Sequence, residues 1–328
     1  MSITGDGPRG PAYAVYDFLE TLGCGFWNSD VETIPVLTNL TIQVGFEKTE
    51  APVLEWRQTM DYFATIPRCL KLRANSGGRI SNKEWKATLG AHPPYKQINH
   101  SFCTRGSAGI PHDTKAFEKH PEWYSSGYPQ TNRSSWAICP SSEGLFEQTI
   151  KDIEAWIAEH PEETCFSLSH GDNGFFCHCE RCNKRRLADP SQSISVLYID
   201  FANRVAKCLG PKYPHITFNV LAYGVTVTPP AAMPRAEPDV AIGYAEIWRN
   251  YSRPITACER VTPNITQWAQ TVDTLYYWDY AACFANYLAP FPIWDLFGES
   301  FRFYQENKFK GGFAQMPLTP SAPGTSSA

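Results

Sequence analysis

Short apolar runs alternate with amphipathic helical patterns along most of this chain, and the alternation limits the fold more than any other feature. The predicted strands cover residues 53–57, 70–74, 97–102, 165–169, 215–222, 240–247, 275–279 and 311–315. The predicted helices cover 146–159, 193–209, 265–272 and 294–307. Eight strands that alternate with helices predict an α/β fold, a (β/α)8 TIM barrel over residues 50–316. The alternative, an open doubly wound sheet, usually has a glycine-rich phosphate loop, which this sequence lacks.

The two ends of the chain have a different pattern. Residues 12–22 predict a helix that stops at Gly23, and residues 25–27 predict a short strand. One helix and one strand cannot form a domain, so residues 1–45 are interpreted as the partial remnant of a small α/β domain. The first residues contain no apolar signal segment, and we expect any targeting segment to lie upstream. Residues 317–328 are small, polar and proline-rich, which predicts a disordered tail.

Composition narrows the class of protein. The 328 residues carry a net charge of -4, so the chain lacks the basic field that nucleic-acid binding requires. No run approaches the roughly twenty apolar residues that a membrane span needs. Aromatic residues make up 14% of the chain, with ten Trp, and such rings serve either in the core or as stacking platforms for sugars. The composition is thus that of an ordinary globular protein, without the features of a nucleic-acid binder or a membrane span.

Residues 165–182 concentrate more reactive groups than any other stretch. An apolar strand ends in Ser-His-Gly-Asp-Asn-Gly, which holds the lone carboxylate Asp172 between glycines, and a C-x-C-x-x-C motif follows. Barrel enzymes keep their chemistry at the carboxyl ends of the strands. Asp172 is therefore the first candidate for a catalytic residue.

The same rule gives candidates after the other strands. Asp172, Glu246 and Asp279 are the candidate catalytic carboxylates, and a pair of carboxylates beside aromatic rings is what glycoside hydrolysis requires. A structural ion pair or a strand-end cap remains the alternative for each. The candidate substrate-binding residues are Arg57, Asn75, His100, His170, Asn173, Tyr223, Trp248, Trp278 and Tyr280. The other residues expected at the same mouth are Asn99, Tyr251, Trp294 and Gln315.

The cysteines offer a further site. Cys177, Cys179 and Cys182 could be three ligands of a structural zinc, with a fourth from His178, Cys103 or Cys139. A disulfide and plain buried thiols are the alternatives. Residues 103–145 form one long connection, of the length that functional lids and cleft walls have, so a shared ligand would fasten that connection to the loop at Asp172. Serine or cysteine nucleophiles are less well supported because no G-x-S-x-G motif occurs.

Several motifs together resemble one known family. They are Tyr-Ala-Val-Tyr-Asp-Phe-Leu-Glu at 13–20 with Gly23, Glu-Thr-Ile-Pro at 32–35, His-Pro-Glu-Trp-Tyr at 120–124, Asp-Asn-Gly at 172–174 with the three cysteines, Trp-Asp-Tyr at 278–280 and Pro-Phe-Pro at 290–292. In order and spacing the chain resembles the barrel proteins catalogued as domain of unknown function 4838, which look like relatives of the α-glucuronidases and β-hexosaminidases. The resemblance implies a hexosaminidase domain 2-like segment before a catalytic barrel, and an exported polysaccharide-degrading glycosidase. It also implies that Asp172 is the general acid.

We therefore expect a glycoside hydrolase that acts on a polysaccharide or oligosaccharide outside the cytoplasm. Asp172 would be the general acid and Glu246 or Asp279 its partner, with no required cofactor. Asn173 stands where the hexosaminidases have a second carboxylate, so their acetamido-assisted mechanism is not implied. The alternatives are a carbohydrate-binding barrel without catalysis and a zinc-dependent hydrolase.

Overall fold

The computed structural model describes most of the chain in two compact units. The described residues are 2–27, 31–59, 65–77, 100–102, 114–126, 137–161, 164–232, 235–284, 286, 289, 291 and 293–315. The first unit comprises Met1–Pro93, Ala281–Phe291 and Phe313–Ala328, and the second comprises Pro94–Tyr280 and Pro292–Gly312. The predicted tail, 317–328, lies outside the described residues.

The first unit contains short elements. Helix α1 (Gly10–Thr21) is followed by the antiparallel pair β1 (Gly25–Phe26) and β2 (Glu32–Thr33), and β3 (Trp56–Thr59) pairs in parallel with β4 (Ser76–Gly77). The turn after α1 places Gly23 at a φ of 92°, a conformation that favours glycine. The predictions of a helix and a strand before residue 28 are thus confirmed.

The predicted strand at 70–74 is wrong. Residues Ile66–Lys71 form helix α2, and the chain then turns into β4 at Ser76. The helix begins at Thr65, whose side chain accepts a hydrogen bond from the Arg68 N–H, and Pro67 occupies one of the first helical positions. These two residues nucleate a helix over an apolar run that was too short to identify by its periodicity alone.

The core of the second unit is a parallel sheet. Its strands lie in the order β9-β8-β7-β6-β5, and the neighbours from β5 to β8 are parallel. Their bounds are β5 Cys165–Ser167, β6 Thr217–Ala222, β7 Val240–Ala245, β8 Thr274–Tyr280 and β9 Phe309–Gln315. These strands confirm five of the eight predicted ones. Both faces of β6 and β7 are buried, as expected for parallel strands covered by other elements.

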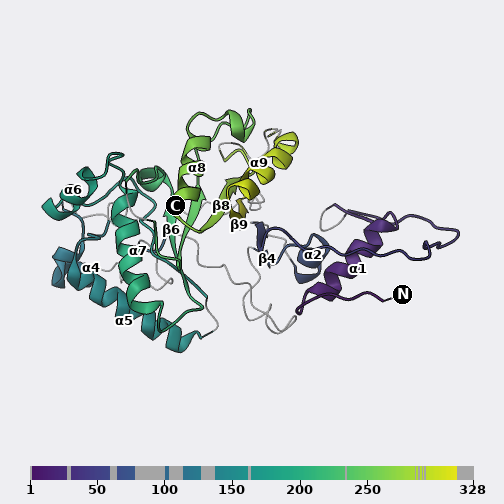
Figure 1. The fold of residues 1–328 in the computed structure, drawn as a ribbon, viewed down its shortest axis with the longest axis horizontal. Coiled ribbons are helices and arrows are strands. Elements are labelled where there is room, and N and C mark those ends of the chain that lie inside the picture. Colours follow the sequence, from purple (N-terminus) through teal and green to yellow (C-terminus); the bar gives the residue numbers. More distant parts are fainter. Residues whose placement is uncertain are drawn as a thin grey trace, which may run out of the picture. The chain divides into compact units, whose positions relative to one another are not determined.

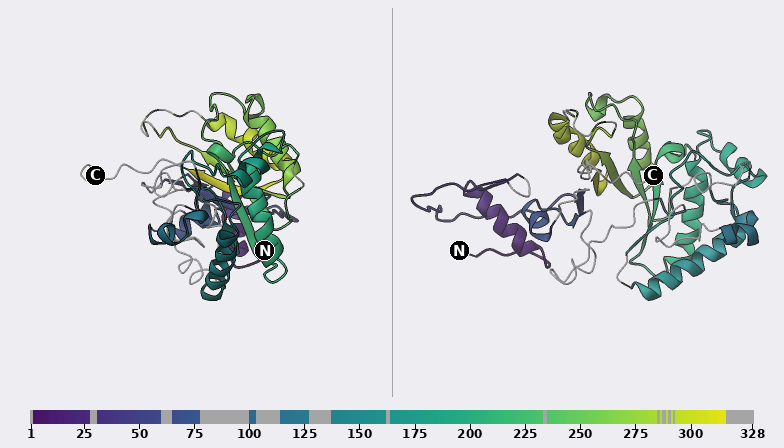
Figure 2. Two further views of the ribbon diagram at one scale, coloured as in Figure 1. Left: turned by 90° about the vertical axis from the view of Figure 1, so that its left-hand side faces the viewer. Right: turned by 180° about the vertical axis from the view of Figure 1, so that it is seen from behind.

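Helices and helical turns connect the strands of the second unit. They are α4 (Thr114–Lys119), η1 (Pro121–Trp123), α5 (Glu143–Glu159), α6 (Glu180–Leu187), α7 (Ser195–Leu209), η3 (Gly224–Thr226), η4 (Ile255–Ala257), α8 (Val261–Thr271) and α9 (Trp294–Glu306). Helix α7 contacts β6, α5 and α6, and Figures 1 and 2 show this group of helices from two sides. The four predicted helices are present. Helix α5 begins three residues earlier than predicted because Ser142 caps it at the Leu145 N–H.

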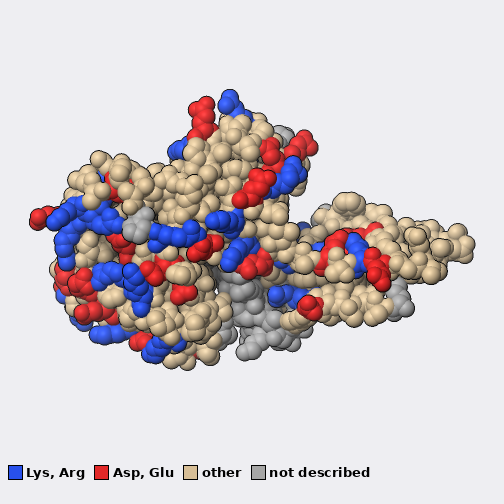
Figure 3. Space-filling model, in the orientation of Figure 1, with Lys and Arg blue, Asp and Glu red and all other residues tan. Residues whose placement is uncertain are grey.

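A mixed α/β fold with a curled parallel sheet is thus established (Figure 1). The predicted strand at 97–102 falls partly outside the described residues, and its described part, 100–102, has no strand. Within the described residues no helix is long and apolar enough to cross a membrane. Acidic and basic side chains are interspersed on the face drawn in Figure 3, in keeping with the small net charge.

The packing of α5 yields a testable prediction. The Ile153 side chain is fully buried, whereas Lys151 on the same helix is exposed. Ile153→Ala should lower the free energy of unfolding by about 3 kcal/mol, because it removes buried apolar groups and leaves a cavity. Lys151→Ala, the control, should change it by less than about 0.5 kcal/mol. Urea denaturation followed by circular dichroism measures both, and equal effects would contradict this packing of α5.

Candidate functional site

A buried serine network holds the end of β5 and the segment 100–102 together. The Ser101 hydroxyl accepts from the Ser169 N–H at 2.8 Å, and the Phe102 N–H donates to the Ser169 carbonyl at 3.2 Å. The Ser169 hydroxyl in turn accepts from the Leu221 N–H in β6 at 2.9 Å. Three segments that are distant in sequence therefore meet next to the candidate residues His100 and His170.

His170 is buried against the end of β6. Its Nδ1 lies 2.6 Å from the Gly171 carbonyl and its Nε2 lies 2.9 Å from the Tyr223 carbonyl. Burial lowers the pKa of His170 to about 4, aided by His100 and opposed by these two carbonyls. The neutral ring has a single N–H, so it can donate to only one of the two carbonyls. His170 thus links the loop after β5 to the start of η3 through its ring nitrogens.

His100 lies between His170 and Asp172. Its Nδ1 lies 3.0 Å from the His170 carbonyl oxygen, which can only accept, so Nδ1 carries the proton. The other nitrogen, Nε2, is 3.7 Å from Oδ1 of Asp172. Asp172 is itself 67% exposed in its side chain, so a ligand can reach the carboxylate. The structure thus brings together three of the predicted site residues.

Aromatic rings lie beside this group. The Tyr223 ring is 5.2 Å from the His100 ring and the Trp278 ring 6.4 Å, and Trp278 stacks with Tyr280 at 6.4 Å and 26°. Burial raises the pKa of Tyr223, and the charge of Asp172 and a hydrogen bond with its side chain raise it further.

Charged side chains influence Tyr280. Burial raises the pKa of Tyr280, and the charges of Tyr223, Asp172, Glu246 and Asp279 raise it further. We call Asp172, Glu246, His100, Tyr223, Trp278 and Tyr280 the strand-end group.

Glu246 has one engaged oxygen and one without a partner. Its side chain is only 4% exposed, and Oε1 accepts from the Trp248 N–H at 3.0 Å and from the Arg260 guanidinium at 2.6 Å. Oε2 is buried and has no hydrogen-bond partner within the described residues. A buried polar atom without a partner is unusual, and at a functional site it is often completed by water or a ligand.

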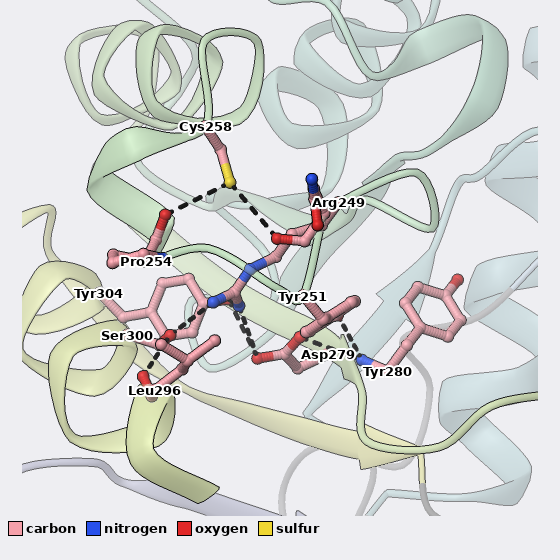
Figure 4. Close-up of polar contacts among 10 residues, drawn as sticks. Arg249, Tyr251, Pro254, Cys258, Asp279, Tyr280, Leu296, Ser300 and Tyr304 are labelled. Carbon is pink, nitrogen blue, oxygen red and sulfur yellow. Dashed lines mark hydrogen bonds and ion pairs between the residues drawn. The ribbon is translucent and has the colours of Figure 1, made fainter. Parts of the chain in front are cut away.

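Asp279 lies in a separate network on the other face of β8. One oxygen, Oδ2, accepts from Arg249 at 3.3 Å and from the Tyr304 hydroxyl at 3.2 Å, and Oδ1 accepts from the Tyr251 hydroxyl and from the Tyr280 N–H at 3.0 Å (Figure 4). Side chains alternate between faces along a strand, so Asp279 points away from Trp278 and Tyr280. Its neighbours on α9 and the absence of a spare oxygen point to a structural ion pair, and the structure does not bring this carboxylate to Asp172.

The remaining predicted residues lie elsewhere. In the first unit the Arg57 guanidinium donates to the Arg73 carbonyl at 2.7 Å, and the Asn75 amide bonds the backbone of residues 55 and 57. The Asn173 Oδ1 accepts from the Phe175 N–H, which closes a tight turn after Asp172. Trp248 and Trp294 are exposed, Gln315 ends β9, and Asn99 lies outside the described residues.

Sequence reasoning missed two arginines. Arg260 precedes α8 and binds Glu246, and the buried Arg249 binds Asp279. Both contacts join positions at least fourteen residues apart. No local pattern in the sequence marks either pair, since each depends on how the loops after β7 return to the sheet.

Four cysteines form a second cluster. The sulfur atoms of Cys139, Cys177, Cys179 and Cys182 all lie within 4.8 Å of one another. The sulfur of Cys139 is 3.7 Å from that of Cys179 and 3.9 Å from that of Cys182, so these pairs are not disulfides. The cluster could hold a metal ion, and Cys139 supplies the fourth position among the candidates named above. Cys103 lies outside the described residues.

Comparison with known proteins identifies the family. One protein family, described as Domain of unknown function (DUF4838), matches residues 26–323. The chain belongs to this family. No curated protein matches it. The DUF4838 assignment agrees with the resemblance found in the sequence motifs, and the description names no activity.

The burial of His170 predicts a pH dependence. Its pKa is about 4 in the folded chain and its ordinary value is 6.5, so the unfolded chain takes up the proton first as the pH falls. The contribution of His170 to stability is therefore complete above about pH 6.5 and is lost as the pH falls towards 4. A difference of this size is worth about 3 kcal/mol.

His170→Gln should remove that part of the pH dependence. Between pH 7 and pH 4, the unfolding free energy of the wild type should fall by about 3 kcal/mol more than that of the variant. His120→Gln, at a side chain that is 44% exposed, serves as the control and should follow the wild type. Urea denaturation at several pH values measures this, and parallel curves for wild type and His170→Gln would contradict the assignment.

The Asp279 network predicts a large effect on stability. Asp279→Asn removes the charge that balances the buried Arg249, and breaking such a pair costs about 3–5 kcal/mol of unfolding free energy. Asp273→Asn changes a carboxylate that is 53% exposed and pairs with Arg235, and it should cost less than about 1 kcal/mol. Thermal and urea denaturation compare the two variants. A small effect at Asp279 would mean that this carboxylate is not a structural partner of Arg249.

Proposed function

We propose that the chain is a glycoside hydrolase that acts on a polysaccharide or oligosaccharide through Asp172 and Glu246. The observation that carries the proposal is an exposed carboxylate after β5 and a buried one after β7, on either side of β6 in one parallel sheet, the buried one having an Oε2 without a partner in the described residues. Glycosidases need two carboxyl groups that differ in environment, because one delivers a proton and the other acts as a charged base or nucleophile.

The surroundings suggest a role for each carboxylate. Glu246 binds two donors through Oε1, which suits a carboxylate that acts in its charged form, and leaves Oε2 for the anomeric carbon or its attacking water. Asp172 is the general acid in this proposal, since its exposed side chain is reachable by the leaving oxygen. Asp279 is left out because its oxygens are already bonded.

The rings of the strand-end group would bind the sugar. Trp278 offers a partly exposed ring that packs on the buried Tyr280, and the His100 ring nitrogen and the Tyr223 hydroxyl offer polar contacts. A polysaccharide substrate also implies that the protein works outside the cytoplasm, as we propose.

The proposal also concerns the fold. We propose that the parallel sheet belongs to a (β/α)8 barrel over residues 50–316, preceded by part of a small α/β domain at 1–45. The parallel order from β5 to β8 and the intervening helices support this.

The four cysteines take no part in the proposed hydrolysis. The carboxylate mechanism needs no cofactor, and a zinc ion held by the four thiolates would be structural. Four protein ligands complete the tetrahedral shell of zinc, whereas a catalytic zinc keeps one position for water or substrate. A zinc-dependent hydrolase is therefore disfavoured by the presence of the fourth cysteine, Cys139.

Hydrolysis assays on the wild type and three variants test the proposal. Aryl glycosides and acidic or N-acetylated polysaccharides are the substrates. Asp172→Asn and Glu246→Gln should each lower kcat/KM by about a hundredfold or more, as expected for the loss of an acid or a partner carboxylate. Asp273→Asn is the matched control and should retain full activity, because its carboxylate lies on the surface at another position.

Two results would contradict the proposal. Full activity in both Asp172→Asn and Glu246→Gln would place the catalytic carboxylates elsewhere. Absence of hydrolysis by the folded wild type, with retained polysaccharide binding that Trp278→Ala abolishes, would instead favour the carbohydrate-binding function.

A further inference from the structure

We propose that Cys139, Cys177, Cys179 and Cys182 bind one zinc ion as four thiolates. The ion would fasten the segment before α5 to the loop that carries Asp172. This inference rests on the cysteine cluster alone and does not depend on glycosidase activity.

The spacing of the sulfur atoms fits one tetrahedral ion. Zinc–sulfur bonds are about 2.3 Å long, and the edges of such a tetrahedron are about 3.8 Å. The distances from the sulfur of Cys139 to those of Cys179 and Cys182 are 3.7 and 3.9 Å, and all four sulfur atoms lie within 4.8 Å. A disulfide would bring two sulfur atoms to about 2.05 Å.

The environment suits thiolates. Cys179 caps the N-terminus of α6, and its sulfur accepts from the Cys182 N–H at 3.4 Å. The Cys182 thiol donates to the hydroxyl of Ser141 at 3.1 Å, and the hydroxyl of Ser126 lies 3.9 Å from the sulfur of Cys177 and can donate to it. Such donors stabilise the negative charge that the sulfur atoms share with a bound cation.

Backbone hydrogen bonds hold the segments that carry the four cysteines side by side. Tyr124 pairs with Ile138 in an antiparallel bridge, and the Cys139 N–H donates to the Trp123 carbonyl at 2.8 Å. The His178 N–H donates to the Ser126 carbonyl at 3.3 Å, which holds the other cysteine segment beside the first. A prearranged donor set lowers the entropy cost of binding the ion.

The chemistry of binding needs no other reactant. Each thiol that is protonated gives up its proton to solvent, and the four thiolates replace the water around Zn²⁺ without any change of oxidation state. The completed shell has no open position, so the role is structural. Cys177 follows Asp172 by five residues, and the ion would therefore anchor the outgoing end of the Asp172 loop.

Metal analysis of the full chain tests the proposal. After purification under reducing conditions and dialysis, plasma mass spectrometry should find one zinc per chain. Cys139→Ser should lose most of it, whereas Cys208→Ser, at an exposed cysteine of α7, should keep it. Reconstitution with Co²⁺ should give the intense red-end visible bands and the near-ultraviolet charge transfer of tetrahedral thiolate coordination in the wild type and Cys208→Ser.

Zinc removal should also loosen the anchored loop. Arg181 and Lys184 are exposed on α6, so trypsin should cut there faster in the zinc-free protein than in the zinc-loaded protein, and added zinc should restore protection. If Cys139→Ser is insoluble, Cys179→Ser and mercurial titration of the wild type replace it, with zinc released as the four thiols react.

Three outcomes would overturn the proposal. They are no bound zinc after reconstitution, iron in its place, and a disulfide within the cluster shown by peptide mass. If the chain hydrolyses glycosides but binds no zinc, only the zinc proposal fails. If it binds zinc but hydrolyses no glycoside, only the glycosidase proposal fails.

Discussion

The parallel hydrogen-bonded ladder from β5 to β8 determines what the candidate site contains. Parallel neighbours end at the same edge of a sheet, so residues that follow each strand are brought together although they are far apart in sequence. Asp172 follows β5, Tyr223 follows β6, Glu246 follows β7 and Tyr280 ends β8. The strand-end group is therefore a consequence of topology, and its chemistry depends on which residue types occupy those four ends.

Side chains alternate between the two faces of β8, so neighbouring residues of this strand belong to two different groups of contacts. Trp278 and Tyr280 lie with the strand-end group, while Asp279 between them faces α9 and binds Arg249 and Tyr304. A buried charge is costly to leave unpaired, which explains why Asp279 has four donors around it. Glu246 shows the opposite arrangement, since its buried Oε2 has no donor within the described residues.

Local patterns in the sequence predicted the parts of the fold that depend on local physics. Strands β5 to β9 and helices α7, α8 and α9 follow from their periodicity, and the choice of Asp172 as a candidate follows from a strand end flanked by glycines. The helix over Ile66–Lys71 was missed because capping by Thr65 outweighed a short apolar run. The contact of Arg260 with Glu246, the network around Asp279 and the choice of Cys139 depend on long-range packing, for which a single sequence has no signal.

The Asp172 loop is bonded to other segments before and after Asp172. Before Asp172, Ser169 and His170 are buried and hydrogen-bonded to the segment 100–102 and to Tyr223. After it, Cys177 lies in the four-cysteine cluster. A chain held at two ends has fewer conformations to lose when it meets a ligand, so the exposed carboxylate can be both accessible and positioned. A cysteine cluster close to a candidate acid can therefore help to position the acid without taking part in its chemistry.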